Sequence, residues 1–302
     1  MKTIYLICDE SGAKGYSDKQ EKCLGEVGVM AGFVFPEKHL NEIRSDLEKI
    51  TSPFFMEGKR HITDLSPDDQ KRLRNDLFPY LKKRNILCLY EAIHSEGFHS
   101  QYEMINELKN KTRAQRRSEI KISTNQTKEL LHVQLFQGIF GKAVALCTDC
   151  IGEKFCLLVI TDKIDASIKE SFENTAKELL SFGNNLKVKT VKGCDSVKKE
   201  IVKREIISKV EDPNNLLGDF SGVQFAIGME DSCLTRTADA IVNSIYHHFR
   251  TREENAIGNA LNTIDAIRGH PLESIIYGLW KDDTLNYFAD ALFMHPNNNE
   301  NS

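Results

Sequence analysis

The sequence predicts an α/β fold in which a mixed sheet carries helices on both faces. Segments with strand character alternate with segments of helical spacing along the 302 residues. Several of the strand segments, beginning with residues 3–7, are apolar at nearly every position, which is typical of strands covered on both sides. With 40% hydrophobic and 28% charged residues, the chain has enough apolar material for a single large domain over residues 1–294.

Composition also excludes some classes of protein. The formal net charge of -4 argues against binding of polyanions by the chain as a whole and leaves local basic patches open. No stretch reaches the roughly 18 apolar residues that cross a bilayer, and the chain starts without a cleavable leader. We therefore expect a cytoplasmic protein without a membrane partner.

The first third of the chain supplies three strands and two helices. We expect strands at residues 3–9, 27–35 and 86–93, and helices at residues 40–50 and 66–83. Pairing of the second strand back onto the first is the simplest topology. The second helix has a strong start, because Ser66 can cap it, Pro67 suits its first position, and Asp68 and Asp69 lie in its first turn.

The remaining two thirds continue the alternation. We expect strands at residues 155–161, 186–191 and 222–229, and helices at residues 130–150, 167–182 and 196–210, followed by a helix that holds Asp239. Accessory helices should occupy about residues 255–294, and residues 295–302 should be a disordered tail.

A polar insertion interrupts this pattern at about residues 95–128. Its later part has few apolar residues and carries a run of cations: Lys109, Lys111, Arg113, Arg116, Arg117 and Lys121. One interpretation is a solvated helical arm, since charge runs usually solvate one face of a helix; the other is a surface that contacts nucleic-acid phosphates.

Two adjacent carboxylates end the first strand. Asp9 and Glu10 are followed by Ser11 and Gly12, which supply a turn. Strand alternation sends the two acidic side chains to opposite faces of the sheet. Asp9 could simply cap the turn, or it could belong to a functional site, since a central strand has no structural use for acids at its end.

Further acids lie at two other points that the fold could bring to the same place. Asp162 and Asp165 follow the most hydrophobic strand, and Asp231 and Asp239 flank the start of the late helix. Carboxylates held close together repel one another unless a cation neutralises them, and Mg²⁺ or Mn²⁺ selects such oxygen ligands. Two such ions stabilise both the attacking and the leaving oxygen of a phosphodiester exchange. Asp9, Asp162 and Asp239 are therefore candidate metal ligands of a nuclease.

His61 is a candidate general base, because its ordinary pKa lies near neutrality; the alternative is a loop histidine without a role. The chain contains no Gly-rich phosphate loop of the GxxxxGK[ST] or GxGxxG type and no GxSxG nucleophile elbow. The common nucleotide-hydrolysing and acyl-transfer chemistries are therefore not predicted.

Four of these segments together resemble the uncharacterised bacterial family catalogued as domain of unknown function 3800. They are Ile7-Cys8-Asp9-Glu10-Ser11-Gly12, His61-Ile62-Thr63-Asp64-Leu65, Val159-Ile160-Thr161-Asp162, and Asp231-Ser232 followed by Ala238-Asp239. The chain departs from the family pattern at Arg236-Thr237, where Gln-Leu is usual, and at Lys59, where an acid is expected. A fourth metal ligand is therefore left open.

The resemblance implies a ribonuclease H-like fold and catalytic roles for Asp9, Asp162 and Asp239, with Glu10 or His61 as further candidates. It also implies a Mg²⁺- or Mn²⁺-dependent nuclease acting on RNA or DNA, with a role in antiviral defence or a mobile element and a partner protein of such a system. The rival hypothesis is a catalytically inactive subunit that binds nucleic acid or assembles into a larger complex.

Overall fold

The chain has a mixed α/β architecture, as the sequence predicts. The computed structural model describes residues 1–55, 61–115, 120–122, 129–152, 154–181, 186–195, 200–209, 220–253, 256–278 and 288–297, with the backbone alone for 109–115, 120–122, 186–195, 201–209 and 288. None of the helices in these ranges combines the length and apolar character that crossing a membrane requires.

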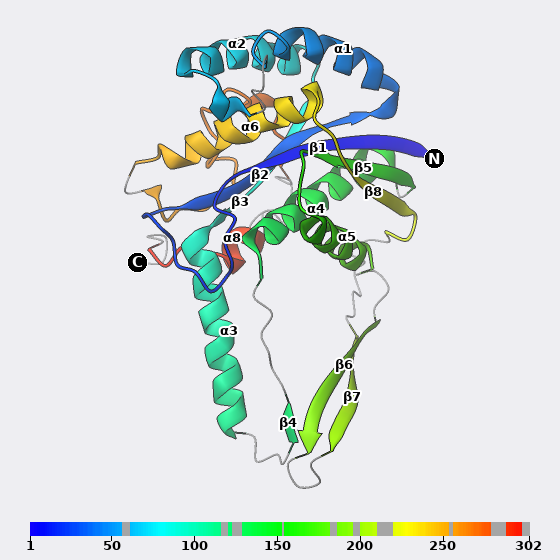
Figure 1. Cartoon of the computed structure of the whole chain (residues 1–302), viewed down its shortest axis with the longest axis vertical. Coiled ribbons are helices and arrows are strands. Elements are labelled where there is room, and N and C mark those ends of the chain that lie inside the picture. The colour runs from blue at the N-terminus through cyan, green and yellow to red at the C-terminus, as the bar shows by residue number, and fades with distance from the viewer. Residues whose placement is uncertain are drawn as a thin grey trace.

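The main sheet has five strands in the order β3-β2-β1-β5-β8 (Figure 1). The strands are β1 (Lys2–Gly12), β2 (Val27–Pro36), β3 (Leu87–His94), β5 (Phe155–Thr161) and β8 (Val223–Met229). β1 runs parallel to β5, and β5 runs parallel to β8, whereas β2 is antiparallel to both of its neighbours. The pairing of the second strand back onto the first is therefore confirmed.

The central strand β1 is covered on both sides, as its sequence predicts. Leu6, Ile7 and Cys8 are each 0% exposed. On the neighbouring strand, a Cβ atom at Gly32 would stand only 1.8 Å from the carbonyl oxygen of Ile7, so this position of β2 accommodates only glycine. The close approach packs the two strands tightly where the polar end of β1 begins.

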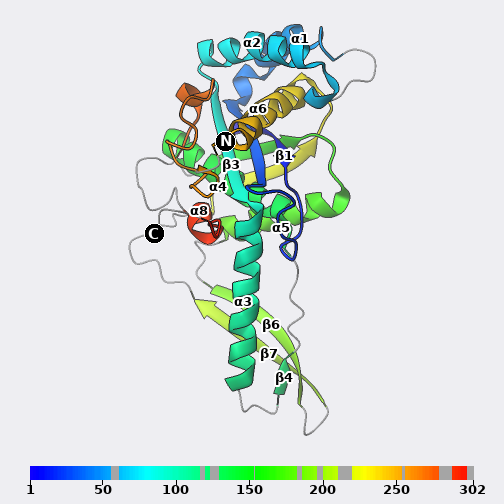
Figure 2. The same cartoon turned by 90° about the vertical axis from the view of Figure 1, so that its left-hand side faces the viewer.

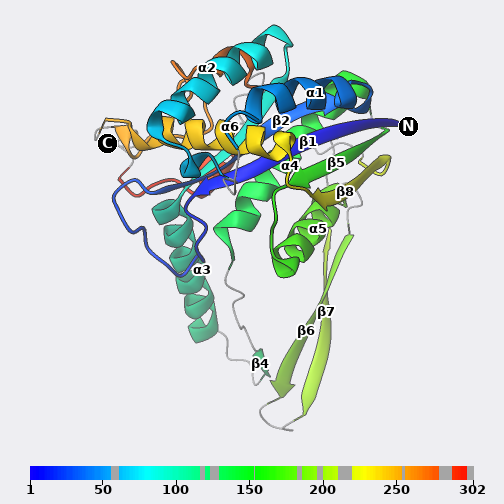
Figure 3. The same cartoon turned by 45° about the horizontal axis from the view of Figure 1, so that its top comes forward.

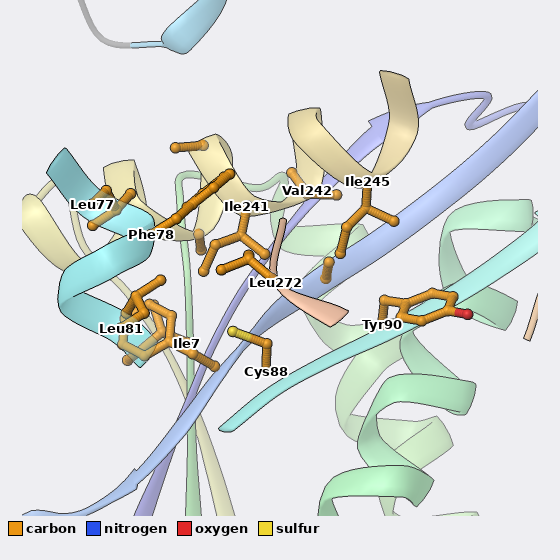
Figure 4. Close-up of a cluster of buried hydrophobic side chains, with 14 of the residues drawn as sticks. Ile7, Leu77, Phe78, Leu81, Cys88, Tyr90, Ile241, Val242, Ile245 and Leu272 are labelled. Carbon is orange, nitrogen blue, oxygen red and sulfur yellow. The ribbon is translucent and has the colours of Figure 1, made fainter. Parts of the chain in front are cut away.

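Helices form a layer on each face of this sheet (Figure 3). One face carries α1 (Leu40–Thr51), α2 (Pro67–Lys83) and α6 (Cys233–Arg250), and the other carries α4 (Leu131–Ile151) and α5 (Ala166–Leu180). Ser66 caps α2 by accepting a hydrogen bond from the Asp69 N–H, as predicted. Figure 4 shows the core on the α6 side, where Ile241 and Ile245 of α6 and Leu77 and Leu81 of α2 lie over the sheet.

An arm made of two distant segments of the chain extends from this body (Figures 1 and 2). It consists of α3 (Ser95–Gln115) and a separate three-stranded sheet of β4 (Ile120–Ile122), β6 (Leu186–Asp195) and β7 (Ile201–Lys209), in the order β4-β6-β7. β4 pairs with the end of β6, so the insertion after β3 meets a second excursion after α5.

The prediction of a helix at residues 196–210 is wrong, because β7 is a strand that pairs antiparallel with β6 over its whole length. Its sequence holds the β-branched pairs Ile201-Val202 and Ile206-Ile207, which favour an extended chain. The prediction gave more weight to the helical spacing of the apolar residues than to this preference. In the folded chain, pairing with β6 stabilises the segment as a strand.

The C-terminal segment also differs from the expected run of accessory helices. Residues 256–272 form turns, and the helical parts beyond them are η5 (Glu273–Ile275) and α8 (Phe288–Leu292) within the described ranges. Asp290 holds the turns in place by accepting hydrogen bonds from the N–H groups of Leu261 and Asn262. His295, expected at the start of a disordered tail, is 1% exposed and packs against His94. Residues 298–302 lie outside the described ranges.

Candidate active site

Asp9 on β1 and Asp162, directly after β5, lie at matching positions along neighbouring parallel strands; β1 continues to Gly12, so the turn expected at Ser11-Gly12 is wrong. Ile7 of β1 is in register with Ile160 of β5, and each aspartate follows two residues later in its own chain segment. Ile7 and Ile160 both contribute to the core on the α6 side, so alternation places the two carboxylates on that same face. Asp9 is 9% exposed, and the Asp162 side chain is 29% exposed.

Asp239 reaches this end of the sheet from α6. Ser232 starts the helix by accepting a hydrogen bond from the Leu234 N–H, and Asp239 follows two turns later on a helix that packs across β1 and β2. The Asp239 side chain is 13% exposed. Its negative charge is close enough to that of Asp9 to raise the pKa of Asp9, so the two groups belong to one cluster.

His61 lies between two of these carboxylates. Its Nδ1 is 3.9 Å from Oδ2 of Asp162 and 3.9 Å from Oδ2 of Asp239, so both carboxylates lie beside the same imidazole nitrogen. The His61 N–H donates to Oδ2 of Asp64, and the next N–H, that of Ile62, donates to Oδ2 of Asp239. Two backbone hydrogen bonds thus hold the histidine at the site.

The electrostatics of the cluster are those of crowded, partly buried acids. Burial raises the pKa of Asp9 well above its ordinary value, and the charges of Glu10 and Asp239 raise it further. Burial also raises the pKa of Asp239 to about 6; Asp162 adds to the rise, while the Ile62 N–H and His61 oppose it. A cation placed among these carboxylates would relieve both shifts.

Glu10 points away from the cluster, as strand alternation predicts. Its Oε1 accepts a hydrogen bond of 2.7 Å from Lys14, and its Oε2 lies 3.3 Å from Nε2 of His132 on α4, across the sheet from α6. Burial alone would raise the pKa of Glu10, but His132 and Lys14 together bring it well below the ordinary value. Glu10 is a paired, ionised group on the opposite face from Asp9.

Two acids that the sequence placed near the site do not join it. Asp165 is an exposed residue at the start of α5, and the exposed Asp231 pairs with Arg236 at 3.0 Å. The side chains of Lys109, Lys111, Arg113, Arg116, Arg117 and Lys121 lie outside the described part of the structure.

The structure adds three residues that sequence reasoning missed. Asp64 holds the His61 backbone. Arg74 of α2 donates to Asn243, which lies one turn after Asp239 on α6. Burial lowers the pKa of Arg74, and the negative charge of Asp239 opposes this fall. Glu230 directly follows β8 and donates its N–H to the carbonyl oxygen of Thr161, the residue before Asp162, and Arg44 binds its carboxylate at 3.1 Å. The sequence could have indicated the position of Arg74, because it precedes the buried Phe78 by four residues and therefore lies on the same face of α2.

The donor chemistry of the cluster fits a hard divalent cation, because Asp9, Asp162 and Asp239 offer carboxylate oxygens in a partly buried setting. As the side chains stand, no group of three or more His, Cys, Asp or Glu residues in the described ranges is arranged to hold a metal ion. The three aspartates would have to draw closer together to bind one ion jointly.

Neither a scan against models of protein families nor searches of curated proteins and of solved structures finds a match to this chain.

Proposed function

We propose that this protein is a Mg²⁺- or Mn²⁺-dependent nuclease with a ribonuclease H-like fold that hydrolyses phosphodiester bonds in RNA or DNA. The observation that carries the proposal is the convergence of Asp9 on β1, Asp162 directly after the adjacent strand β5, and Asp239 on α6, with raised pKa values at Asp9 and Asp239. Groups with perturbed pKa values concentrate at functional sites.

The sheet supports the fold part of the proposal. Ribonuclease H-like domains share a five-stranded mixed sheet in which only the second strand is antiparallel to the others, and β2 alone has that direction in the main sheet. The resemblance of the Asp9-Glu10-Ser11-Gly12 segment to the domain of unknown function 3800 family points the same way.

The chain's own groups would divide the work as follows. Asp9, Asp162 and Asp239 would hold the divalent ions, which when bound lower the pKa of water and neutralise charge on the phosphate. His61, half-exposed and beside two of these carboxylates, would take a proton on Nδ1 from the attacking water or orient that water. Glu10 would stabilise the end of β1 from the other face and would not touch the substrate.

Nucleic acid is the partner that this activity requires. The insertion carries Lys109, Lys111, Arg113, Arg116, Arg117 and Lys121, and the two long strands of the arm, β6 and β7, add six basic and two acidic residues. An arm of this composition suits a phosphate backbone. A role in antiviral defence or a mobile element, with a partner protein of that system, remains part of the proposal through the family resemblance alone.

The alternative is a catalytically inactive subunit that binds nucleic acid or assembles into a larger complex. One observation favours it: His61 already lies beside both Asp162 and Asp239 and can balance their charge without a metal when it is protonated. This alternative predicts salt-sensitive nucleic-acid binding and no metal-dependent cleavage.

The deciding experiment is a cleavage assay on labelled RNA, DNA and RNA–DNA hybrid with Mg²⁺, Mn²⁺ or EDTA. We expect metal-dependent cleavage by the wild type and a loss of at least about 100-fold in Asp9→Asn and Asp162→Asn, as when a preorganised electrostatic group is removed. Asp165→Asn is the matched control, because Asp165 is exposed and only three residues from Asp162. Full activity in both site variants would exclude the mechanism, and binding without cleavage in the wild type would favour the inactive subunit.

A further inference from the structure

Three polar residues form a row along one face of α6 that begins at the candidate active site. Asp239, Asn243 and His247 follow one another at four-residue spacing, so their side chains leave the helix on the same side, about 6 Å apart along its axis. Asp239 is partly buried, Asn243 is 5% exposed, and His247 is exposed. The row therefore leads from the acidic cluster to the surface of the molecule.

Arg74 of α2 lies against the middle of this row. Its Nη2 donates a hydrogen bond of 2.6 Å to Oδ1 of Asn243 and a longer one of 3.5 Å to Oε1 of Gln70. Burial lowers the pKa of His247, and the positive charge of Arg74 lowers it further. The guanidinium group of Arg74 is therefore close to both residues that follow Asp239 in the row.

Arg74 has no direct ion-pair partner. Both of its acceptors are neutral amides, and within the described ranges no carboxylate lies within ion-pair distance of its guanidinium group. Burial lowers the pKa of Arg74, and the charge of Asp239 opposes this fall. Since a guanidinium group keeps its proton at neutral pH, Arg74 is a cation that Asp239 balances from beyond contact distance in the metal-free protein.

Metal binding would change this balance. Asp239 is one of the proposed metal ligands, and two divalent ions more than neutralise three carboxylates. The charge of Arg74 is then left for an anion. A guanidinium group binds phosphate oxygens through two parallel N–H donors, and a nucleic-acid strand carries a phosphate on each side of the one that is cleaved.

We propose that Arg74, held in place by Asn243, binds the phosphate adjacent to the cleaved bond on a strand of RNA or DNA when the candidate site holds metal. One helical turn is comparable to the spacing of successive phosphates, so a strand with one phosphate at Asp239 brings its neighbour to Arg74. The exposed His247 lies where the strand continues. The proposal rests on the proposed metal site and adds a substrate-binding group to it.

Fluorescence anisotropy with short labelled single strands of RNA and of DNA tests this role. The titrations use Ca²⁺, which also selects oxygen ligands, or EDTA, so that binding is measured in place of cleavage. In Ca²⁺, Arg74→Gln should bind about tenfold or more weakly than the wild type, the loss expected for a charge-assisted hydrogen bond. The loss should be smaller in EDTA, because the free Asp239 carboxylate then repels the phosphate. The slope of log affinity against log salt should fall by about 1.

Two further arginine variants provide the controls. Arg72→Gln removes the same charge from an exposed residue that pairs with Asp69, and Arg72 lies two residues from Arg74, on another face of α2. It should bind as the wild type does. Arg74→Lys keeps the charge without the planar fork, so its affinity should lie between those of the wild type and Arg74→Gln. If thermal melts show Arg74→Gln unfolded at the assay temperature, Arg74→Lys replaces it in the test.

Strands in which one phosphate at a time is replaced by an uncharged methylphosphonate locate the contact. At one position the modified strand should bind the wild type as weakly as the unmodified strand binds Arg74→Gln, with no further loss when the two changes are combined. The proposal is overturned if neither strand binds the wild type in Ca²⁺, if the Arg74 variants bind as the wild type does, or if the loss is equal in Ca²⁺ and EDTA. The expected binding without cleavage in Mg²⁺ or Mn²⁺ would instead exclude the nuclease activity and leave the phosphate contact of Arg74 in place.

Discussion

The N–H of Ile62 donates a hydrogen bond of 2.6 Å to Oδ2 of Asp239, a residue 177 positions further along the chain. Ile62 is 0% exposed and belongs to the core on the α6 side, so its backbone position is fixed by packing. The loop that carries His61 is thus tied to α6 through the main chain. A substitution of the His61 side chain does not remove this backbone hydrogen bond. The contribution of His61 to catalysis can therefore be measured separately from its contribution to folding.

His61→Asn should lower cleavage without lowering stability. A general base contributes about 100-fold or more to a rate, whereas substitution of a half-exposed loop residue changes stability by only about 0.5 kcal/mol. The His61 side chain is 51% exposed. Single-turnover cleavage rates and thermal melts of the two proteins provide the check. An unchanged rate at saturating metal would remove His61 from the mechanism.

Asp239→Asn should stabilise the metal-free protein at neutral pH. The folded protein holds the Asp239 proton up to about pH 6, whereas an unperturbed carboxyl loses it near 3.8. Between these values the folded state binds more protons than the unfolded state, so stability falls as pH rises. Since one pKa unit corresponds to about 1.4 kcal/mol, the variant should gain up to about 3 kcal/mol above pH 6 and nothing near pH 4.

Urea unfolding in EDTA from pH 4 to pH 8 measures this difference. Asparagine can still accept the Ile62 hydrogen bond, so the comparison isolates the charge. Asp165→Asn again serves as the control, because Asp165 is exposed. A variant that is less stable than the wild type at pH 8 would contradict the electrostatic account of the cluster.

Most of the main sheet and its helices could be predicted from the sequence, because local pattern and burial agree there. β1 is apolar on both faces and is buried on both faces, and α2 begins at the Ser66 cap. Alternation along β1 also separates Asp9 from Glu10 correctly, since Glu10 meets His132 on the opposite face. These features depend on neighbours in sequence or on a single strand, where the rules of periodicity are strongest.

The missed features depend on contacts with other elements, which the spacing within one segment does not show. β7 takes its conformation from β6, and the turns after Ala256 take theirs from Asp290, so neither is encoded in local spacing. The same holds for Arg74, which reaches α6 only when α2 packs beside it. The sequence could identify the acids of the candidate site, but the hydrogen bond from the Ile62 N–H to Asp239 could be identified only in the folded chain.

His132→Asn should destabilise the protein, and the loss should shrink as pH falls. Glu10 and His132 are 13% and 8% exposed, so removal of the histidine leaves a buried carboxylate with Lys14 alone. A broken buried pair costs about 3 kcal/mol or more. Because His132 and Lys14 keep the folded pKa of Glu10 below its ordinary value, their stabilisation is present above that value and is lost as pH falls through the folded pKa.

Lys14→Ala is the comparison for this pair, because Lys14 is 49% exposed and its ion pair should contribute less than about 1 kcal/mol. Denaturant unfolding at pH 7 of both variants gives the two values. Equal losses in the two variants would show that burial of Glu10 does not govern the interaction. Cleavage activity should remain in both, since Glu10 faces away from Asp9.

Lys142→Met should cause a large loss of stability at neutral pH. Lys142 binds the buried Glu91 at 2.8 Å and also donates to the carbonyl oxygen of Tyr90, while the second carboxylate oxygen of Glu91 has no partner among the described residues. Burial raises the pKa of Glu91, and Lys142 opposes the rise. Without the lysine, the buried carboxylate should cost about 3–5 kcal/mol at pH 7. The loss should be smaller near pH 5, where Glu91 can accept a proton more readily.

The double variant Glu91→Leu/Lys142→Met should recover most of this loss, because it removes both charges and keeps an apolar side chain beside Gly138. Lys169→Met provides the control: Lys169 and Glu173 form an exposed pair on α5, and its loss should cost less than about 1 kcal/mol. Urea unfolding of the wild type, the two single variants and the double variant at pH 5 and pH 7 measures all of these terms. A double variant as unstable as Lys142→Met would show that packing around Gly138, rather than an unpaired charge, is responsible for the loss.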